Sequence, residues 1–174
     1  RCKALGDKFA LPTRLLLGET TGITLRIRGE CPEVESRSDI VLIIDHSGSM
    51  TGAPLDAAKA AAEAFINSMN LGRDRIAVVG FNQDAALRQA LTTDGLAAID
   101  AVRALAAGGG TDIAAGVDEA RNELTGPRRR LGAGSVIVLL TDGGSNVAEA
   151  LRAADQAKLE GARLFTVAFG AGAN

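Results

Sequence analysis

The chain has 174 residues, of which 47% are hydrophobic, enough for the core of one ordinary domain with a short additional segment. Trp and Tyr are absent and the formal net charge is −2, which argues against an aromatic or basic surface for nucleic acid. No apolar run is long enough to span a membrane. We therefore expect neither a nucleic-acid partner nor direct membrane insertion, and the sequence does not indicate an oligomeric state.

Residues 1–37 differ in pattern from the rest and are predicted to form a β appendage followed by a linker. Residues 23–28 alternate apolar and polar side chains, as in a strand with one solvated face. Gly18 and Gly22 favour a turn, so a β-hairpin is predicted between residues 15–17 and 23–28.

Both cysteines of the chain, Cys2 and Cys31, lie in this appendage. A disulfide between them would suit an oxidising compartment, and two unrelated thiols are an equally good interpretation. They do not form a zinc-site pattern, since no second cysteine pair or histidine cluster accompanies them. The chain begins without Met or an apolar signal region, so we expect it to be part of a longer protein.

From residue 38 onward, apolar strands alternate with helical segments. Continuous apolar runs predict strands at 40–44, 75–81, 136–140 and 164–169. Helices are predicted from 54 to 69, from 94 to about 105, from 111 or 112 to 126, and from 146 to 161. The link at 82–84 is too short for a crossover, so the strand at 85–91 is predicted to pair antiparallel at the sheet edge. The fold class is α/β, with a mostly parallel sheet between two helical layers.

A carboxylate and two hydroxyls follow the first of these strands directly. Asp45, Ser47 and Ser49 are spaced two residues apart behind the apolar run at 40–44. Such hard oxygen ligands are those that Mg²⁺, Mn²⁺ and Ca²⁺ prefer. This loop is therefore the first candidate part of a metal site.

Two later loops supply matching oxygens. Thr111 follows three glycines at 108–110, and Asp142 lies just beyond the strand at 136–140. Ligands of open α/β sheets bind at the carboxyl ends of the strands, where these loops would lie. The sequence thus predicts one divalent metal site assembled from three loops.

Each of these residues also has an ordinary structural interpretation, because Ser, Thr and Asp commonly cap helices and form turns. The agreement of three loops favours the metal, with Thr111 as a ligand and Asp112 as an acceptor bracing the loops from behind. His46 is predicted to point away from Asp45 and to lie on the loop rim. The arginines at 128–130 are predicted to form a solvated loop.

These motifs resemble the von Willebrand factor type A domain and its metal-ion-dependent adhesion site, over residues 39–169. The resemblance implies a Rossmann-like three-layer sandwich and a metal with one open position, which a partner's carboxylate usually fills. It assigns the ligands of Mg²⁺, or of Mn²⁺ or Ca²⁺, as Asp45, Ser47, Ser49, Thr111 and Asp142. Family members usually carry a further helix, strand and helix, so residues 38–174 are predicted to be such a domain lacking its C-terminal elements.

We expect a metal-dependent adhesion module that binds a protein ligand through an acidic residue, located outside the cell or at its surface. The alternatives are a scaffold in an intracellular complex of the chelatase type and, less favoured, a metal-assisted hydrolase. The chain has no Gly-x-Ser-x-Gly elbow and a single histidine without an evident catalytic partner. No Lys or Arg in the metal loops would hold a phosphoryl group. Enzymatic activity is therefore not expected.

Overall fold

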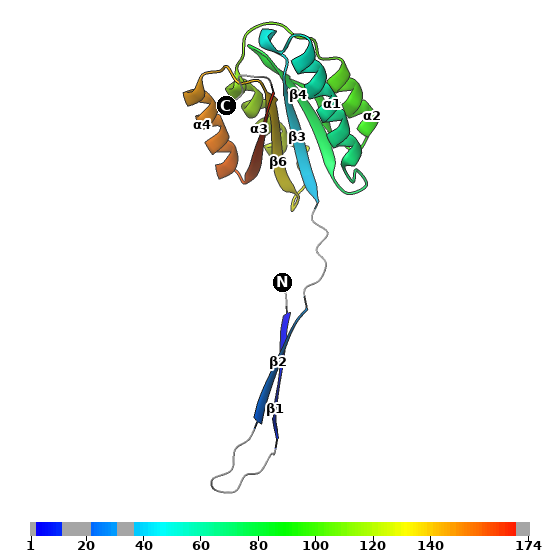
Figure 1. The fold of residues 1–174 in the computed structure, drawn as a ribbon, viewed down its shortest axis with the longest axis vertical. Helices are drawn as coiled ribbons and strands as arrows, with labels where there is room; N and C mark the ends of the chain where they lie inside the picture. The colour runs from blue at the N-terminus through cyan, green and yellow to red at the C-terminus, as the bar shows by residue number, and fades with distance from the viewer. Residues whose placement is uncertain (1–2, 12–21, 31–36, 170–174) are drawn as a thin grey trace. The chain divides into compact units, whose positions relative to one another are not determined.

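The computed structural model describes residues 3–11, 22–30 and 37–169, which belong to two separate compact units (Figure 1). Unit 1 spans Arg1–Glu35 and unit 2 spans Ser36–Asn174. This division lies close to the predicted boundary at residue 37. Cys2 and Cys31, whose pairing the sequence leaves open, lie outside the described residues.

In unit 1, strand β1 (Lys3–Leu11) pairs antiparallel with strand β2 (Gly22–Glu30). The strand expected at 23–28 is thus present, but its partner is 3–11, and the run at 15–17 lies outside the described residues. The sequence-based choice of partner was wrong because the alternation of β1 is interrupted by Gly6 and Asp7. The nearer apolar run gave the stronger local signal.

Unit 2 contains the predicted mostly parallel sheet. Its strands are β3 (Ser38–Asp45), β4 (Arg75–Phe81), β5 (Ala85–Thr92), β6 (Gly134–Thr141) and β7 (Ala162–Ala168). They lie in the order β5-β4-β3-β6-β7, and all neighbours are parallel except β4 and β5. The predicted fold class and the antiparallel edge pair are confirmed.

Helices cover both faces of this sheet (Figure 1). They are α1 (Ala53–Ser68), α2 (Gly95–Arg103), α3 (Ile113–Thr125) and α4 (Val147–Leu159), with a 3₁₀ turn at Gly48–Met50. Asp94, Asp112 and Asn146 cap three of them by accepting hydrogen bonds from backbone N–H groups of the first turn. None of the helices in the described ranges is long and apolar enough to cross a membrane.

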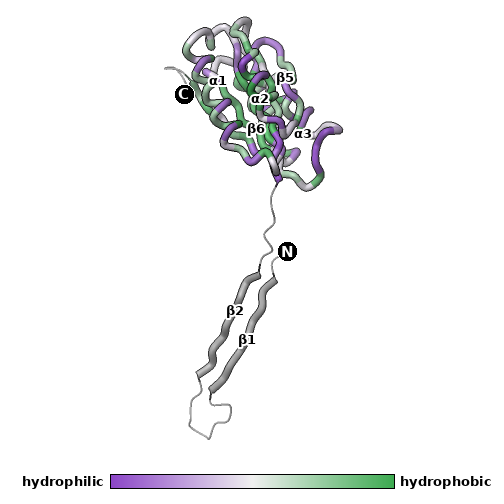
Figure 2. Tube along the Cα trace, turned by 90° about the vertical axis from the view of Figure 1, so that its right-hand side faces the viewer, coloured by the Kyte–Doolittle hydropathy of each residue, from purple (hydrophilic) through white to green (hydrophobic). Residues whose placement is uncertain are grey.

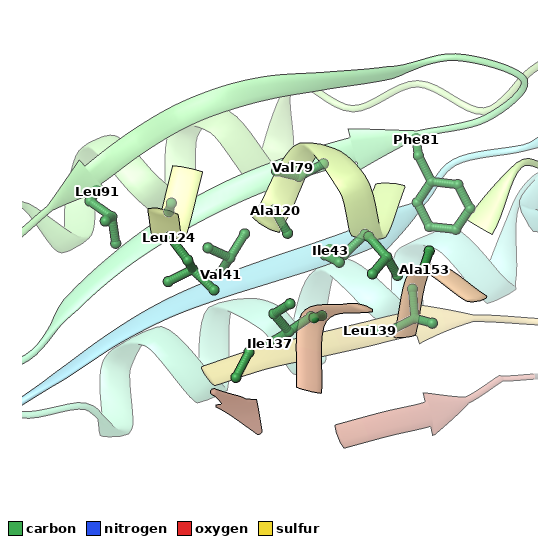
Figure 3. Close-up of a cluster of buried hydrophobic side chains, with 14 residues drawn as sticks. Val41, Ile43, Val79, Phe81, Leu91, Ala120, Leu124, Ile137, Leu139 and Ala153 are labelled. Atoms are coloured by element: carbon green, nitrogen blue, oxygen red, sulfur yellow. The ribbon is translucent and has the colours of Figure 1, made fainter. Parts of the chain in front are cut away.

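Strand β3 is buried on both faces, which explains why its sequence is continuously apolar. Val41 and Ile43 face α3 and α4, together with Ile137 of β6, in the cluster drawn in Figure 3. Leu42 and Ile44 face α1 and α2. Figure 2 shows the hydrophobic colour concentrated on the strands between the helices. The core therefore fixes where β3 ends, and with it the position of Asp45.

An ion network closes the opposite end of the sheet, where β3 begins. Asp39 is 2% exposed and accepts hydrogen bonds from Arg75 at 3.0 and 2.7 Å and from Arg130 Nε at 2.9 Å. Glu123 is similarly buried and pairs with Arg128. Arg128 and Arg129 are exposed, as expected for a solvated loop, whereas Arg130 is half-buried. The expectation missed that Arg128 pairs with Glu123, five positions away, and that Arg130 pairs with Asp39, 91 positions away.

Burial alone would raise the pKa of Asp39. The hydrogen bonds from Arg75 and Arg130 outweigh it and hold that pKa below its ordinary value of 3.8. A carboxyl whose pKa is lowered on folding stabilises the native state above its unfolded pKa, and this contribution is lost as the pH falls through the folded pKa. Asp39 thus stabilises unit 2 at neutral pH.

We expect Asp39→Asn to lower the free energy of unfolding by about 3 kcal/mol at neutral pH, because it leaves two arginines without their shared buried partner. The measurement is urea denaturation followed by circular dichroism. The difference from the parent chain should shrink as the pH falls below about 4. As a matched control, Glu63→Gln breaks the exposed pair with Arg103 and should destabilise the protein far less than Asp39→Asn. Equal effects of the two substitutions would contradict a structural role for Asp39.

Candidate metal centre

The three predicted loops meet at the carboxyl edge of the parallel sheet, the upper edge of unit 2 in Figure 1. Asp45 is the last residue of β3, and Asp142 directly follows β6. These strands are neighbours, with Ile44 opposite Leu140, so their ends lie side by side. Thr111 precedes α3, whose N-terminus faces the same edge. The topology alone therefore brings the loops together.

The first loop is organised around the Asp45 carboxylate, which is 0% exposed. Its Oδ1 accepts a hydrogen bond from the Ser47 backbone N–H at 2.8 Å, and its Oδ2 accepts one from the Thr141 hydroxyl at 2.6 Å. The hydroxyl oxygens of Ser47 and Ser49 are hydrogen-bonded at 3.1 Å. The two serine oxygens and the carboxylate are thus gathered within one turn.

The glycine loop at 108–110 is tied to the first loop through main-chain hydrogen bonds. The N–H of Gly48 donates to the carbonyl of Gly109 at 3.0 Å, and the N–H of Gly108 donates to the carbonyl of His46 at 2.8 Å. Gly109 has a φ of +83°, which L side chains rarely adopt, and a Cβ there would lie 1.9 Å from Gln83 Oε1. The positive φ favours glycine at this position, whereas the Gln83 side chain could move away from a Cβ.

Asn82 and Gln83 hold the same glycine loop from the β4–β5 turn. The Asn82 amide donates to the Gly108 carbonyl at 2.9 Å, and Gln83 Oε1 accepts from the Gly110 N–H at 2.8 Å. Sequence reasoning treated these residues only as a turn and missed this role. A polar Asn-Gln pair at a strand end facing three glycines is the signal that could have found it.

Asp112 caps α3, and its carboxylate accepts from the Ala115 N–H at 3.0 Å. Its own N–H donates to the Asn82 carbonyl at 2.6 Å, and the next N–H, of Ile113, donates to Ser145 Oγ at 3.1 Å. The predicted bracing role is thus carried by its backbone and the cap. Together these bonds fix Thr111 between the first and third loops.

The third loop follows Thr141, the last residue of β6, and begins with Asp142. Thr141 Oγ1 accepts from the Gly143 N–H at 3.1 Å while donating to Asp45, so it links β6 to β3. Thr141 was not among the site residues predicted from the sequence. Its place at the end of β6, in register beside Asp45, is the signal that would have identified it.

Asp142 and Thr111 are half-buried, and among the described residues no hydrogen-bond partner is assigned to their side-chain oxygens. In those ranges no three His, Cys, Asp or Glu side chains lie together so that they could hold a metal ion. A cation bound here would therefore need the hydroxyl oxygens of the loops as well as the two carboxylates.

His46 is buried, not on the rim as predicted, with 6% of its surface exposed. Its ring points away from Asp45, and Nδ1 donates to the Ala106 carbonyl at 3.0 Å. Burial lowers the pKa of His46, an effect to which the nearby positive charge of Arg88 adds. His46 is held by its bond to the Ala106 carbonyl and is not among the five candidate ligands.

The donor set fits a hard divalent cation. Each carboxylate oxygen of Asp45 accepts a single hydrogen bond from Ser47 or Thr141, which leaves a further lone pair on each oxygen. No Lys or Arg in the described ranges forms an ion pair with this buried carboxylate. A bound cation would supply the missing positive charge.

We expect Thr141→Val to lower the free energy of unfolding by about 1–3 kcal/mol, because Asp45 Oδ2 and the Gly143 N–H each lose a partner. Urea denaturation in chelator, which removes any contribution of bound metal, provides the measurement. Thr141→Ser retains the hydroxyl and should cost about 1 kcal/mol or less. If serine and valine destabilise equally, the hydrogen bond to Asp45 does not matter.

Known proteins were compared with this chain. The magnesium-chelatase 60 kDa subunit of Rhodobacter capsulatus is 35% identical over 140 residues, which cover 78% of this chain and 23% of that protein. The chain spans about a quarter of the length of the curated relatives it matches.

Two solved structures share the fold. The vWF domain of the type V pili tip protein Mfa5 from Porphyromonas gingivalis is 28% identical, with a TM-score of 0.58, over 64% of this chain and 40% of that chain. Proximal thread matrix protein 1 from the mussel byssus, solved with a zinc-occupied MIDAS motif, is 22% identical, with a TM-score of 0.67, over 76% and 36%.

The family match covers most of the chain, from residue 39 to residue 174. It includes all five candidate ligands and, apart from Ser38 at the start of β3, every strand of the five-stranded sheet. The chain therefore belongs to the von Willebrand factor type A domain family.

Proposed function

We propose that unit 2 is a metal-dependent protein-binding module. In this proposal Asp45, Ser47, Ser49, Thr111 and Asp142 hold one divalent cation, and a partner protein supplies an acidic side chain to the open position. The observation that carries the proposal is the fully buried Asp45 carboxylate, which has two neutral hydrogen-bond donors and no paired cation among the described residues.

The charges of the site favour an acidic partner. Asp45 and Asp142 carry two negative charges, and the three hydroxyls carry none. The two aspartates therefore balance the charge of a divalent cation, and the loaded site does not become negatively charged. Hydroxyl oxygens are weak donors, and the cation stays attractive to an incoming carboxylate. Such a site binds by coordination and needs no catalytic group, so we propose no enzymatic activity for this chain.

Mg²⁺, Mn²⁺ or Ca²⁺ is the proposed ion, since all five ligands are oxygens. The mussel relative holds zinc in its MIDAS motif, which supports occupancy of this type of site by a divalent ion. Soft ligands that would select zinc in a closed site are absent from the five proposed here.

We propose a location outside the cell or at its surface, supported by the similarity to the vWF domain of a pili tip protein. The second candidate is a scaffold within an intracellular complex, which the 35% identity to a magnesium-chelatase subunit favours. The redox state of Cys2 and Cys31 in protein isolated from its source separates the two, because a disulfide persists in oxidising compartments.

We expect Mn²⁺ to raise the melting temperature of the parent chain relative to chelator, and Asp142→Ala to abolish this shift. A ligand that binds only the folded state stabilises it by about 2.7 kcal/mol at a concentration 100 times its Kd, which corresponds to several degrees. Circular dichroism in Mn²⁺ and in chelator measures the shift. Asp142 is half-buried, so the variant should keep its fold in chelator.

Asp84→Ala is the matched control, because it removes an exposed carboxylate from a neighbouring loop and should leave the shift intact. A parent chain that shows no shift in Mn²⁺, Mg²⁺ or Ca²⁺ would contradict the proposed metal site. A shift that survives Asp142→Ala would place the ion elsewhere.

We also expect a short peptide bearing one Glu to bind the Mg²⁺-loaded protein and its Gln counterpart to bind at least tenfold more weakly, since only the carboxylate can coordinate the ion. Peptide titration followed by backbone amide shifts in NMR measures both affinities. Glu-peptide binding should vanish in chelator. Equal binding with and without metal would rule out coordination through the ion.

A further inference from the structure

Exposed arginines gather at the amino edge of the sheet, opposite the candidate metal centre and at the lower edge of unit 2 in Figure 1. Arg37 precedes β3, Arg129 lies in the loop before β6, and Arg163 is the second residue of β7. These strands are parallel neighbours, so their starts lie side by side. The Gly134 N–H donates to the Arg37 carbonyl at 2.8 Å, and a Cβ on Gly134 would lie 3.7 Å from Arg163 Nη2. Arg129 lines a hollow with the same glycine, so the three arginines share one surface.

The positive charge of these arginines is not compensated within the described part of the chain. No hydrogen bond or ion pair is assigned there to the side chains of Arg37, Arg129 and Arg163. Four carboxylates near the strand starts already have arginine partners of their own, namely Asp39, Asp74, Glu123 and Glu160. The formal net charge of −2 therefore does not exclude a positive surface at one edge of the sheet.

Two exposed leucines lie at the same surface. Leu131 is 86% exposed and Leu159 is 82% exposed, the two highest values among the large hydrophobic residues of the described ranges. Leu131 follows Arg130 in the loop before β6, and Leu159 is the last residue of α4. The loop and the end of α4 are neighbours, because Arg129, Leu131 and Glu160 line one hollow of about 220 Å³. Exposed leucines beside unpaired arginines favour contact with a surface that is both anionic and apolar.

We propose that the protein adsorbs to anionic membranes through this surface, the arginine edge, which consists of Arg37, Arg129, Leu131, Leu159 and Arg163. Its arginines bind lipid phosphates, with which the planar guanidinium makes paired hydrogen bonds. Its leucines enter the boundary between headgroups and acyl chains, so the protein lies on one leaflet. The five residues include no aromatic side chain that would stack on the bases of a nucleic acid.

The opposite edge of the sheet carries negative charge. Asp45 and Asp142 lie there, with Asp84 exposed in the β4–β5 turn. The negative potential of an anionic leaflet attracts the arginine edge and repels these carboxylates. Adsorption therefore orients unit 2 with the candidate metal centre away from the lipid, where a soluble partner can reach it. Adsorption itself needs no metal, so this proposal does not rest on the proposed function.

Vesicle flotation of the full chain in chelator tests the proposal. Vesicles of phosphatidylcholine with phosphatidylglycerol should bind the chain at least about tenfold more tightly than vesicles of phosphatidylcholine alone, because each basic residue near an anionic surface contributes about a fivefold gain. Raising the salt concentration from about 0.1 M to about 1 M shortens the Debye length from about 10 Å to about 3 Å and should weaken this binding.

Arg129→Gln and Arg163→Gln should each lower the vesicle partition coefficient about fivefold at low salt and reduce its salt dependence. Leu131→Ala should lower it several-fold at both salt concentrations, since the lost contact is apolar. Arg152→Gln and Leu151→Ala are the matched controls, because they change exposed residues of α4 away from this edge and should leave binding unchanged. All five positions are exposed, so the variants should keep the melting temperature of the parent chain.

Asp142→Ala should bind vesicles as the parent chain does, so failure of the metal proposal leaves this one intact. Absence of binding, equal binding to both kinds of vesicle, or binding that survives the combined Arg129→Gln and Arg163→Gln substitutions would each overturn the proposal. Binding of soluble polyglutamate through the same two arginines without binding of vesicles would also overturn it, because the partner would then be an acidic protein.

Discussion

The architecture of the candidate metal site depends on one buried charge, the carboxylate of Asp45. Its exposure is 0%, and its two recorded partners are the Ser47 N–H and the Thr141 hydroxyl, both neutral. Burying an unpaired carboxylate is costly, so the fold must compensate by hydrogen bonding and by any cation it can attract. The parallel pairing of β3 with β6 supplies Thr141, and the core that buries both faces of β3 prevents Asp45 from moving into water. The packing around Asp45 therefore creates a site that favours the binding of a cation.

Each end of β3 carries a buried aspartate, and the two carboxylates are stabilised in different ways. Asp39, at the start, is as buried as Asp45 but is neutralised by Arg75 and Arg130, which are part of the chain. Asp45, at the end, has no such partner in the described ranges. A buried carboxylate already paired with two arginines has no capacity for a cation and serves stability. One that lacks a paired cation is suited to an exchangeable ion. The contrast explains why the candidate site lies at one edge of the sheet although both edges carry buried aspartates.

The sequence alone predicted the elements of unit 2, because each depends on local pattern: apolar runs, capping residues and turns. The five candidate ligands come from short motifs at strand ends and stay a prediction. It failed where a residue's environment is made by distant segments. Arg130 contacts Asp39 from 91 positions away, and His46 contacts the Ala106 carbonyl from 60 positions away, so neither burial was evident locally. Thr141 was underestimated for the same reason, since its partner Asp45 belongs to the neighbouring strand. Strand β1 was missed because its own alternation is interrupted.

The backbone of His46 ties the first loop of the candidate metal site to the glycine loop. Its carbonyl accepts from Gly108 and its N–H donates to the Phe81 carbonyl, so its backbone helps to hold the loop that carries Thr111. Its side chain donates to the Ala106 carbonyl, two residues before that loop. The position of Thr111 therefore depends on a buried residue that is not one of the five proposed ligands.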